Sequence, residues 1–316
     1  MSLSLLLVSF LTFVEFNCEN LFDCHHDSLK QDYEFLPEGP RKWNQRKFWN
    51  KLNNISKTII SCGMKGNDWF MPDFIALCEV ENDSCMQYLC KRSALRKAQY
   101  EYIITQSPDV RGIDVALMYA PGRFLPISHY SLNIQPVKDM RPTRDILYVS
   151  GRIMTDDTLH IFVVHAPSKY GGSKQTLPYR KAVTHRLAMA IDSIKGIHKE
   201  PNIIVAGDFN DYANSPALRP LYDTGMVNVS EKATGTHGTP ASYKYKGEWK
   251  SIDHIFFSSW LLPELLSCHI NDAPFLLEKD EKYGGVQPFR TYRAYHYRNA
   301  YSDHLPIVVR FTMPQP

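Results

Sequence analysis

The chain contains many short apolar runs, and polar residues stand at one end of several of them. Glu79, His165 and Asp208 each follow such a run directly. In SIDHIFFS (251–258) and SDHLPIVV (302–309) the order is reversed, and an Asp-His pair precedes the run. Strands that run in opposite directions and carry polar residues at opposite ends deliver those residues to one rim of a sheet. This pattern predicts a β-rich fold with a polar site at one edge.

Two stretches have apolar residues at helical spacing and predict long helices over residues 44–61 and 176–197. Strands outnumber helices, and most connections are too short for a crossover between parallel strands. We therefore expect mixed, largely antiparallel sheets with helices outside. The sequence has no internal repeat and no Gly/Ser linker, which favours one domain. The predicted strands are Leu11–Phe16, Phe74–Cys78, Tyr102–Thr105, Asp114–Tyr119, Ile146–Ile153, Leu159–His165, Ile203–Gly207, Ser251–Ser258 and Leu305–Phe311.

The charge of the chain is nearly balanced, with 36 Lys and Arg against 33 Asp and Glu. A protein that binds nucleic acid chiefly by neutralising phosphates usually has a strongly basic domain. Any phosphate recognition must therefore be built locally, at a site. No stretch approaches the ~18 apolar residues of a membrane-spanning helix. The composition is that of a globular protein and excludes collagen-like and disordered chains.

Residues 1–10 (MSLSLLLVSF) form an apolar extension ahead of the first predicted strand. They resemble the apolar part of an export signal but lack a basic start and a small-residue cleavage site. The compartment stays open: cytoplasmic, or exported if this extension belongs to a longer leader. The seven cysteines include no CxxC pair, which favours reduced thiols over a zinc or redox site.

The predicted rim would hold four carboxylates, several histidines and at least one asparagine. Unpaired carboxylates repel one another, and a bound divalent cation is the simplest remedy. Each motif alone is also compatible with an ordinary turn or cap. Their occurrence together, in this order, is what indicates a functional site.

The motifs resemble those of the endonuclease/exonuclease/phosphatase superfamily, which includes pancreatic deoxyribonuclease, abasic-site endonucleases, sphingomyelinases, deadenylases and inositol-polyphosphate phosphatases. The resemblance covers residues 11–312, which we expect to form a single domain. It implies a four-layer α/β/β/α sandwich of two mostly antiparallel sheets flanked by helices. The matching segments are FNCENLFD (16–23), ALCEVEN (76–82), VVHAPSKYGG (163–172), AGDFND (206–211), SIDHIFFS (251–258) and SDHLPIVV (302–309).

The resemblance implies a Mg²⁺ site, with Mn²⁺ as an alternative cation. Glu79 would be the main metal ligand, because its carboxylate is a hard oxygen donor for a hard ion. Asn17 would hold the metal or a phosphate oxygen, and Asp303 would add to the metal site. Glu19 stands where some members place an acidic ligand and is a secondary candidate.

The resemblance also assigns catalytic roles. Asp208 would orient and deprotonate the attacking water, and Asn210 would support an oxygen of the pentavalent intermediate. His304, oriented by Asp253, would contact the scissile phosphate, and His165 would point at the same phosphate. Since no Ser or Cys nucleophile is required, we expect direct in-line attack by water.

Two single basic residues are candidate phosphate contacts. Lys169 stands where many members have Arg; it keeps the charge but loses the bidentate fork. Arg144 precedes a predicted strand and could reach a phosphate. The alternative for Arg144 is a surface cation beside Asp145.

Residues 272–301 lie between the last two site motifs, and loops in such positions overhang the site. Arg290, Arg293 and Arg298 are candidate phosphate contacts there. Tyr292 or Tyr295 is a candidate stacking ring. The alternative is a β-hairpin with aromatic cross-strand pairs.

Two further segments carry basic residues. Residues 238–249 predict a hairpin that packs a Trp, with Lys244 and Lys246 as candidates to face the site. Residues 39–67 hold seven Lys or Arg and no acidic residue. We interpret 39–67 as an outer helix with basic residues over apolar packing; a nucleic-acid-binding stripe is the alternative.

The leading hypothesis is a Mg²⁺-dependent phosphoesterase that hydrolyses a phosphodiester, as a nuclease or phosphodiesterase, with nucleic acid as a candidate partner. A phosphomonoesterase acting on a small or lipid headgroup phosphate is the alternative. The third hypothesis is a binding module that has the same fold but no catalytic activity. The retained Glu79, Asp208, Asn210, Asp253 and His304 argue against it. No protein partner is implied.

Overall fold

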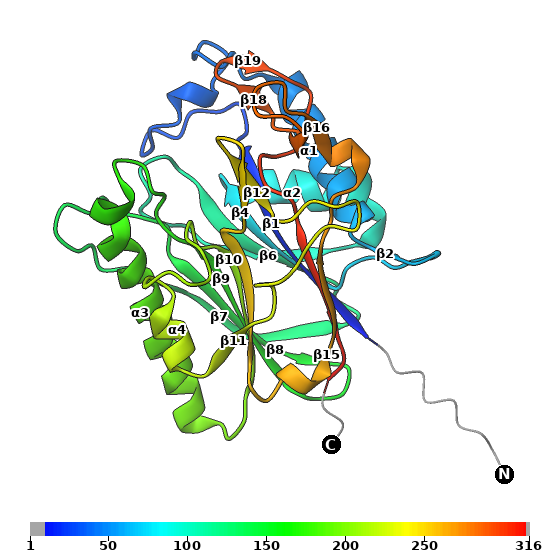
Figure 1. Ribbon diagram of the computed structural model, residues 1–316, viewed down its shortest axis with the longest axis vertical. Coiled ribbons are helices and arrows are strands. Elements are labelled where there is room, and N and C mark those ends of the chain that lie inside the picture. Colours follow the sequence, from blue (N-terminus) through cyan, green and yellow to red (C-terminus); the bar gives the residue numbers. More distant parts are fainter. Residues whose placement is uncertain (1–9, 314–316) are drawn as a thin grey trace.

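The computed structural model describes residues 10–313 and contains two six-stranded sheets packed face to face (Figure 1). Strands of the first sheet, in spatial order, are β15 (Leu265–Ile270), β20 (Ile307–Phe311), β1 (Leu11–Leu21), β4 (Phe74–Val80), β6 (Asp114–Tyr119) and β5 (Glu101–Ile104). Strands of the second are β11 (Met226–Asn228), β14 (Asp253–Ser258), β10 (Asn202–Asp208), β9 (Thr158–His165), β8 (Ile146–Ile153) and β7 (Phe124–Leu132).

The two sheets share one pairing pattern. Each has a single parallel pair at its centre, β1 with β4 and β9 with β10, and antiparallel pairs on both sides. Because the strands of a parallel pair end at the same edge, each pair sends its two carboxyl ends to one rim. The mostly antiparallel character expected from the sequence is confirmed.

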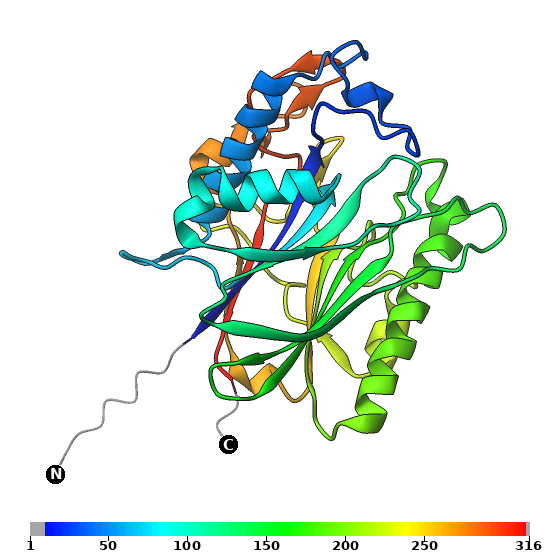
Figure 2. The ribbon, with the colours of Figure 1, turned by 180° about the vertical axis from the view of Figure 1, so that it is seen from behind.

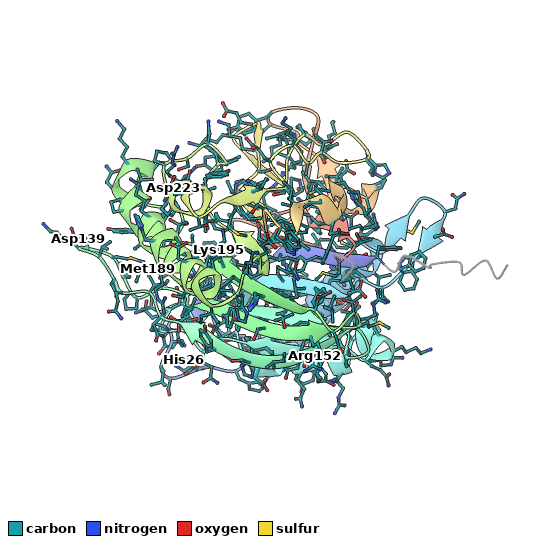
Figure 3. The ribbon with its side chains drawn as sticks, turned by 90° about the horizontal axis from the view of Figure 1, so that it is seen from below. His26, Asp139, Arg152, Met189, Lys195 and Asp223 are labelled. Atoms are coloured by element: carbon teal, nitrogen blue, oxygen red, sulfur yellow. The ribbon has the colours of Figure 1, made fainter. Side chains whose placement is uncertain are left out.

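Helices cover both outer faces and complete four layers, α/β/β/α, as predicted (Figure 2). The first sheet is covered by α1 (Gln45–Ser61) and α2 (Asp83–Lys91), and the second by α3 (Ser173–Ile197) and α4 (Arg219–Asp223). Figure 3 looks along the layers, with Met189 and Lys195 labelled on α3. Between the sheets lies an apolar core that includes Phe13, Val163 and Ile255.

The helix α1 illustrates how the sequence produces these layers. The side chain of Asn44 accepts a hydrogen bond from the Lys47 amide (3.1 Å) and caps the first turn. Phe48, Leu52 and Ile55 lie on one side of the helix and are fully or almost fully buried. This apolar stripe fixes α1 against the outer face of the first sheet.

The predicted strands are all present, with shifted ends. β1 extends to Leu21 through a bulge, and β14 and β20 each begin two residues later than expected. Pro306 precedes β20 and has no amide hydrogen for the ladder. The helix α2 and the strands β7 and β15 were not predicted, because they are short or lie at sheet edges with weak patterns.

The segment 272–301 folds as two small hairpins, and its part from Thr291 to Tyr301 packs against α1 (Figure 1). Lys51 on α1 is buried and donates to Thr291 Oγ1 (2.6 Å) and the Tyr301 carbonyl (2.5 Å). Lys47 and Lys57 lie over aromatic rings of the same segment. The basic side of α1 is therefore a packing surface, which supports the outer-helix interpretation. The hairpins are β16 (Leu277–Lys279) with β17 (Val286–Pro288), and β18 (Tyr292–Arg293) with β19 (His296–Tyr297).

The hairpin predicted at 238–249 forms from β12 (Tyr243–Tyr245) and β13 (Glu248–Lys250), and Trp249 packs against the inter-sheet core. Lys244 pairs with Asp280 (2.8 Å) and does not face the site, and Lys246 is exposed. The remaining short elements are β2 (Met64–Lys65), β3 (Asp68–Trp69) and 3-10 turns at Tyr33–Phe35, Ala94–Ala98, Leu262–Glu264 and Pro274–Leu276.

All seven cysteines are free thiols, as the sequence favours. Within residues 10–313, none of the helices combines the length and the apolarity that crossing a membrane requires. The apolar extension predicted at 1–10 lies outside the described residues except for Phe10.

Candidate active site

Strand ends from both sheets meet at one rim, around a cavity of about 490 Å³ that we call the rim cavity. The parallel pairs deliver Glu79 on β4, His165 on β9 and Asp208 on β10, and the loop before β20 delivers Asp303 and His304. The arrangement at the rim is the one expected from the order of polar and apolar residues in the sequence.

Asp208 lies at the centre of this group and is buried. Its Oδ2 accepts a hydrogen bond from Asn17 Nδ2 (3.0 Å), and its Oδ1 accepts one from the Asn210 amide (2.7 Å). Nε2 of His165 lies 3.6 Å from Oδ2, and Nε2 of His304 lies 4.0 Å from it. Burial, and then the charge of Asp253, raise the pKa of Asp208 to about 7. Asp208 is therefore a carboxyl group that can exchange a proton near neutral pH.

His304 is paired with a fully buried carboxylate. Its Nδ1 lies 2.9 and 3.0 Å from the two oxygens of Asp253, and Ser242 Oγ donates to Asp253 Oδ2 (2.6 Å). Burial alone would lower the pKa of His304, but Asp253, Asp208 and Asp303 raise it well above the ordinary value. The imidazole is thus held as a cation, with Nε2 facing Asp208 and Asp303.

Glu79 and His165 form the other side of the group. The Asn20 amide donates to Glu79 Oε2 (2.9 Å), and Glu79 Oε1 lies 3.8 Å from His165 Nε2. Burial, together with the charges of Arg144 and Arg111, lowers the pKa of His165 well below its usual value. His165 is therefore neutral beside two carboxylates, in contrast to His304.

Two residues at the rim have an unfavourable backbone conformation, and a third position requires glycine. Glu79 (φ 64°) and Asn210 (φ 50°) are left-handed, a conformation that is unfavourable for most side chains, Glu in particular. Gly207 (φ 150°) approaches β9 so closely that a Cβ would lie 1.8 Å from the Val164 carbonyl oxygen. Strain of this kind persists where the surrounding structure holds it, and it gathers at functional sites.

The oxygens at the rim fit a hard divalent cation. Within residues 10–313, Glu79 Oε1 accepts no hydrogen bond, and neither does Asp303 Oδ1, which lies 3.9 Å from His304 Nε2. Carboxylate and amide oxygens are the donors that Mg²⁺ and Mn²⁺ take in proteins.

Glu19, the secondary metal candidate, is not brought to the rim cavity. Its Oε2 accepts the Thr291 amide (2.6 Å), and Arg290 and Lys51 lie 3.4 and 3.9 Å from its carboxylate. It lines a smaller neighbouring cavity of about 190 Å³ instead. Burial, and then the charge of Asp303, raise the pKa of Glu19 to about 7.

The residues predicted to contact the substrate lie in different parts of the structure. Arg144 lines the rim cavity, where it pairs with Asp109 (3.0 Å) and donates to the Ala166 carbonyl (2.8 Å). It is only 8% exposed, so the alternative of a surface cation is wrong. Lys169 is held by Asp211 (3.0 Å) and lies 3.6 Å from the centre of the Tyr212 ring.

Arg290 does not line the rim cavity but bridges Glu19 and Asp303, with 2.9 Å to Asp303 Oδ2. Tyr292 is 5% exposed, packs near Trp43 and donates to the Arg41 carbonyl (3.1 Å). The expectation that Tyr292 stacks on a substrate ring is therefore not met, because its ring is covered by the protein.

Several residues near the site were not predicted. Arg111 and Arg141 line the rim cavity from loops without periodic signal. Tyr243 lies beside His304, with ring centres 4.8 Å apart. Glu15 is completely buried below Asp208, and neither carboxylate oxygen has a hydrogen-bond partner among the described residues. A lone Glu within the apolar run LTFVEF was the available signal for Glu15.

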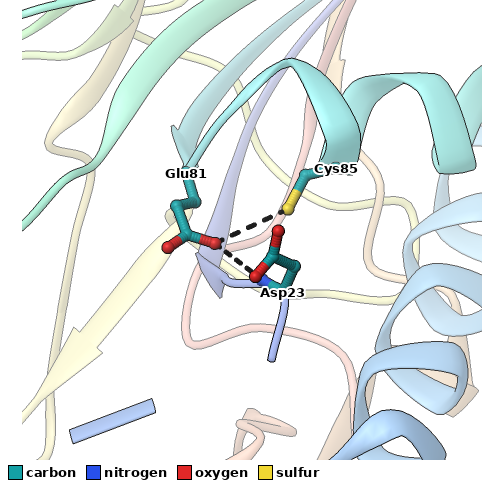
Figure 4. A group of neighbouring side chains, drawn as sticks. All are labelled: Asp23, Glu81 and Cys85. Carbon is teal, nitrogen blue, oxygen red and sulfur yellow. Dashed lines mark hydrogen bonds between the residues drawn. The ribbon is translucent and has the colours of Figure 1, made fainter. Parts of the chain in front are cut away.

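A second buried group, which we call the closed cluster, contains Asp23, Glu81 and Cys85 (Figure 4). The Asp23 amide donates to Glu81 Oε2 (2.7 Å), and Cys85 Sγ lies 3.9 Å from the same oxygen. Asn82 Nδ2 donates to Asp23 Oδ2 (3.1 Å). Its carboxylates are thus engaged by neighbouring donors, and none of its members lines the rim cavity.

Comparison with solved structures shows the same architecture in proteins of low sequence identity. The matches include TDP2 of D. rerio humanized by 14 mutations (TM-score 0.58, 16% identity, covering 96% of this chain and 99% of that chain). They also include an endonuclease/exonuclease/phosphatase family protein of Bacteroides thetaiotaomicron (0.57, 15%, 98% and 99%). The human Nocturnin catalytic domain matches as well (0.58, 15%, 96% and 94%). At these identities the similarity establishes the fold.

No curated protein sequence matches the chain significantly. A family model, described as "Endonuclease/Exonuclease/phosphatase family", matches residues 12–313. This range includes every strand that delivers a residue to the rim cavity. The polar rim, the four layers and this match agree, and the chain belongs to the endonuclease/exonuclease/phosphatase family, whose members hydrolyse phosphoric esters.

Proposed function

We propose that this protein is a Mg²⁺-dependent phosphodiesterase in which water attacks the phosphorus directly. The observation that carries the proposal is the opposition of Asp208 and the Asp253–His304 pair, with 4.0 Å between Asp208 Oδ2 and His304 Nε2. One side offers a carboxyl group that exchanges protons near neutral pH, and the other offers a fixed cation. A phosphoester needs both, because its oxygens are anionic and its attacking water must lose a proton.

In this proposal Asp208 orients the water and takes its proton as the oxygen–phosphorus bond forms and the ester bond breaks. His304, held by Asp253, donates a charged hydrogen bond to a phosphate oxygen. Asn210 supports a second oxygen, and neutral His165 can donate to a third. The departing oxygen takes a proton from solvent.

Glu79, Asn17 and Asp303 would hold the divalent cation, which when bound neutralises phosphate charge as a Lewis acid. Lys169 and Arg290 act indirectly: Lys169 fixes Asp211 beside Asn210, and Arg290 fixes Asp303. The geometry thus divides the site into a proton-accepting part and a charge-neutralising part.

The direct test measures hydrolysis of bis(p-nitrophenyl) phosphate and of p-nitrophenyl phosphate, with Mg²⁺, with Mn²⁺ or with a chelator. We expect cation-dependent hydrolysis of the diester, lost in Asp208→Ala and His304→Ala. Near-normal turnover by either variant would contradict the assignment. A clear preference for the monoester would replace this proposal with a phosphomonoesterase.

A further inference from the structure

The rim cavity extends well beyond the group formed by Asp208 and its neighbours. The sheets stack so that β20 lies near β14, β1 near β10, β4 near β9, and β6 near β8. The cavity follows this order along the rim, from Asp303 and His304 through Asp208 and Glu79 to the loops beside β6 and β8. One end of the cavity is therefore formed by residues with no part in the proposed hydrolysis.

Three arginines line that end. Arg111 comes from the loop before β6, and Arg141 and Arg144 come from the loop that joins β7 to β8. The carboxylates there are Asp109, which pairs with Arg144, and Asp139. The cations outnumber the carboxylates by one, whereas the opposite end of the cavity is acidic.

Two of these arginines have no carboxylate partner. Arg141 makes no ion pair and no hydrogen bond with any residue in the described part of the chain, although it lines the cavity. Among the described residues, the guanidinium of Arg111 donates only to the side chain of Asn20, and the backbone amide of Asn20 donates to Glu79. Unpaired guanidinium groups that face a cavity are ready donors for a phosphate or carboxylate group.

Arg144 connects this end to the reacting centre. It donates to the Ala166 carbonyl, which also accepts a hydrogen bond from Asn210 Nδ2 (3.0 Å). Neighbouring strands of a sheet are ~5 Å apart. The end of the rim cavity beside β6 and β8 therefore lies roughly 5–10 Å from His165 on β9. Consecutive phosphates of one nucleic acid strand are separated by a comparable distance.

We propose that Arg111, Arg141 and Arg144 form an anion subsite that takes a second phosphate of the substrate, next to the phosphodiester that is cleaved. This inference rests on the proposed function for the reacting phosphate and adds the substrate class. The class is a phosphoester that carries a second phosphate near the one that is cleaved, as a nucleoside bisphosphate or a nucleic acid strand does. A substrate with a single phosphate leaves Arg111 and Arg141 without an anionic partner among the described residues.

Binding of two small probes tests the subsite without any turnover. Titration calorimetry compares thymidine 3′,5′-bisphosphate with thymidine 5′-monophosphate, which differ only by the second phosphate. For the unmodified protein we expect about tenfold or greater preference for the bisphosphate, the gain typical of a charge-assisted contact. Equal affinities would overturn the proposal.

The double variant Arg111→Gln/Arg141→Gln should bind both probes with nearly equal affinity. Both side chains are exposed, so the substitutions leave the fold intact. Arg152→Gln is the matched control: it lies on β8 at the end of the β7–β8 hairpin opposite the loop that carries Asp139 (Figure 3). Retention of the preference in the double variant, or its loss in Arg152→Gln, would contradict the subsite.

Failure of the subsite and failure of the proposed function give different results. If bis(p-nitrophenyl) phosphate is hydrolysed but the bisphosphate is not preferred, only the subsite proposal is contradicted. A preference for the bisphosphate without hydrolysis of bis(p-nitrophenyl) phosphate contradicts only the proposed reaction. A thymidine octanucleotide then separates the two sources: tighter binding than the bisphosphate, with steep salt dependence, indicates a strand. Equal binding indicates a nucleoside bisphosphate, and either result supports the arginine subsite.

Discussion

The rim cluster (Asp208, Asp253 and His304) and the closed cluster (Asp23, Glu81 and Cys85) are alike in composition and burial, yet they have different environments. In the rim cluster, the charge of the carboxylates is opposed by a cationic imidazole, and Asp208 and His304 line an open cavity. In the closed cluster, burial and the charge of Asp23 raise the pKa of Glu81 to about 9, so Glu81 is protonated at neutral pH. The two clusters therefore differ in counter-charge and in access to a cavity, and only the rim cluster has both.

The largest expected effect is a difference in kcat/KM between a variant of the rim cluster and a variant of the closed cluster. Asp208→Asn keeps the shape of the side chain but removes the proton acceptor, so we expect kcat/KM to fall about 10²- to 10⁴-fold on bis(p-nitrophenyl) phosphate. Glu81→Gln replaces a carboxyl group that is already neutral and should leave kcat/KM close to that of the unmodified protein. A comparable loss in Glu81→Gln would show that the closed cluster takes part in the reaction.

The next effect concerns the backbone that supports the rim cluster. Gly207→Ala places a methyl group against the Val164 carbonyl, and we expect it to lower the free energy of unfolding by at least about 3 kcal/mol. Gly122→Ala is the matched control, since a Cβ there meets nothing within 4 Å. Urea unfolding of both variants measures the difference. Equal stability of the two would mean that β10 can move away from β9 without cost.

The closed cluster should also be visible in the pH dependence of stability. The pKa of Glu81 is raised from 4.5 to about 9 in the folded protein, so between these values the unfolded chain has lost a proton that the folded chain keeps. The free energy of unfolding should therefore fall as pH rises, by up to about 1.4 kcal/mol per pH unit.

Glu81→Gln removes this contribution. Relative to the unmodified protein, the variant should be increasingly stable as pH rises across that range and similar at its acidic end. Denaturant unfolding at both ends of the range measures the change. If the difference in unfolding free energy between Glu81→Gln and the unmodified protein does not change with pH, Glu81 is ionised in the folded protein.

The smallest expected effect is at Arg290, which holds Asp303 from outside the rim cavity. Arg290→Ala should lower kcat/KM about tenfold, the loss of one charge-assisted contact. Arg293→Ala in the same segment is the control, because Arg293 is exposed and lies 3.6 Å from Glu278. If Arg290→Ala and Arg293→Ala behave alike, Arg290 is a structural residue of the 272–301 segment.

The order of polar and apolar residues predicted mixed, largely antiparallel sheets and a polar rim with Glu79, His165 and Asp208, while the four layers and the place of Asn17 came from the family resemblance. That prediction depends on strand direction and on alternation, and it fails where alternation stops. Asn17 and Glu19 are two residues apart and would share a face in a regular strand. The bulge in β1, with left-handed Glu19 and Asn20, turns the Glu19 carboxylate toward Thr291 instead.

Loops lack even this signal. Nothing in the sequence around Arg111 or Arg141 indicates that the two side chains line one cavity, because their loops meet only through the stacking of β6 on β8. Tyr292 was misplaced for the same reason, since no period in 272–301 shows that its ring turns toward Trp43. The chemistry at strand ends is therefore readable from sequence, while the surroundings of a substrate depend on the assembled fold.

The pairing of β1 with β20 has a consequence for how the protein is made. Leu11 on β1 pairs with Phe311 on β20, so these two partners are 300 positions apart in the sequence. Contacts of such long sequence separation form slowly, and a growing chain exposes the unpaired edge of β1 until β20 has been made. Asn17 on β1 and His304 just before β20 are brought together by the same pairing. Activity should therefore arise only after the segment that contains His304 and β20 has been synthesised, and until then the edge of β1 is open to pairing with other chains.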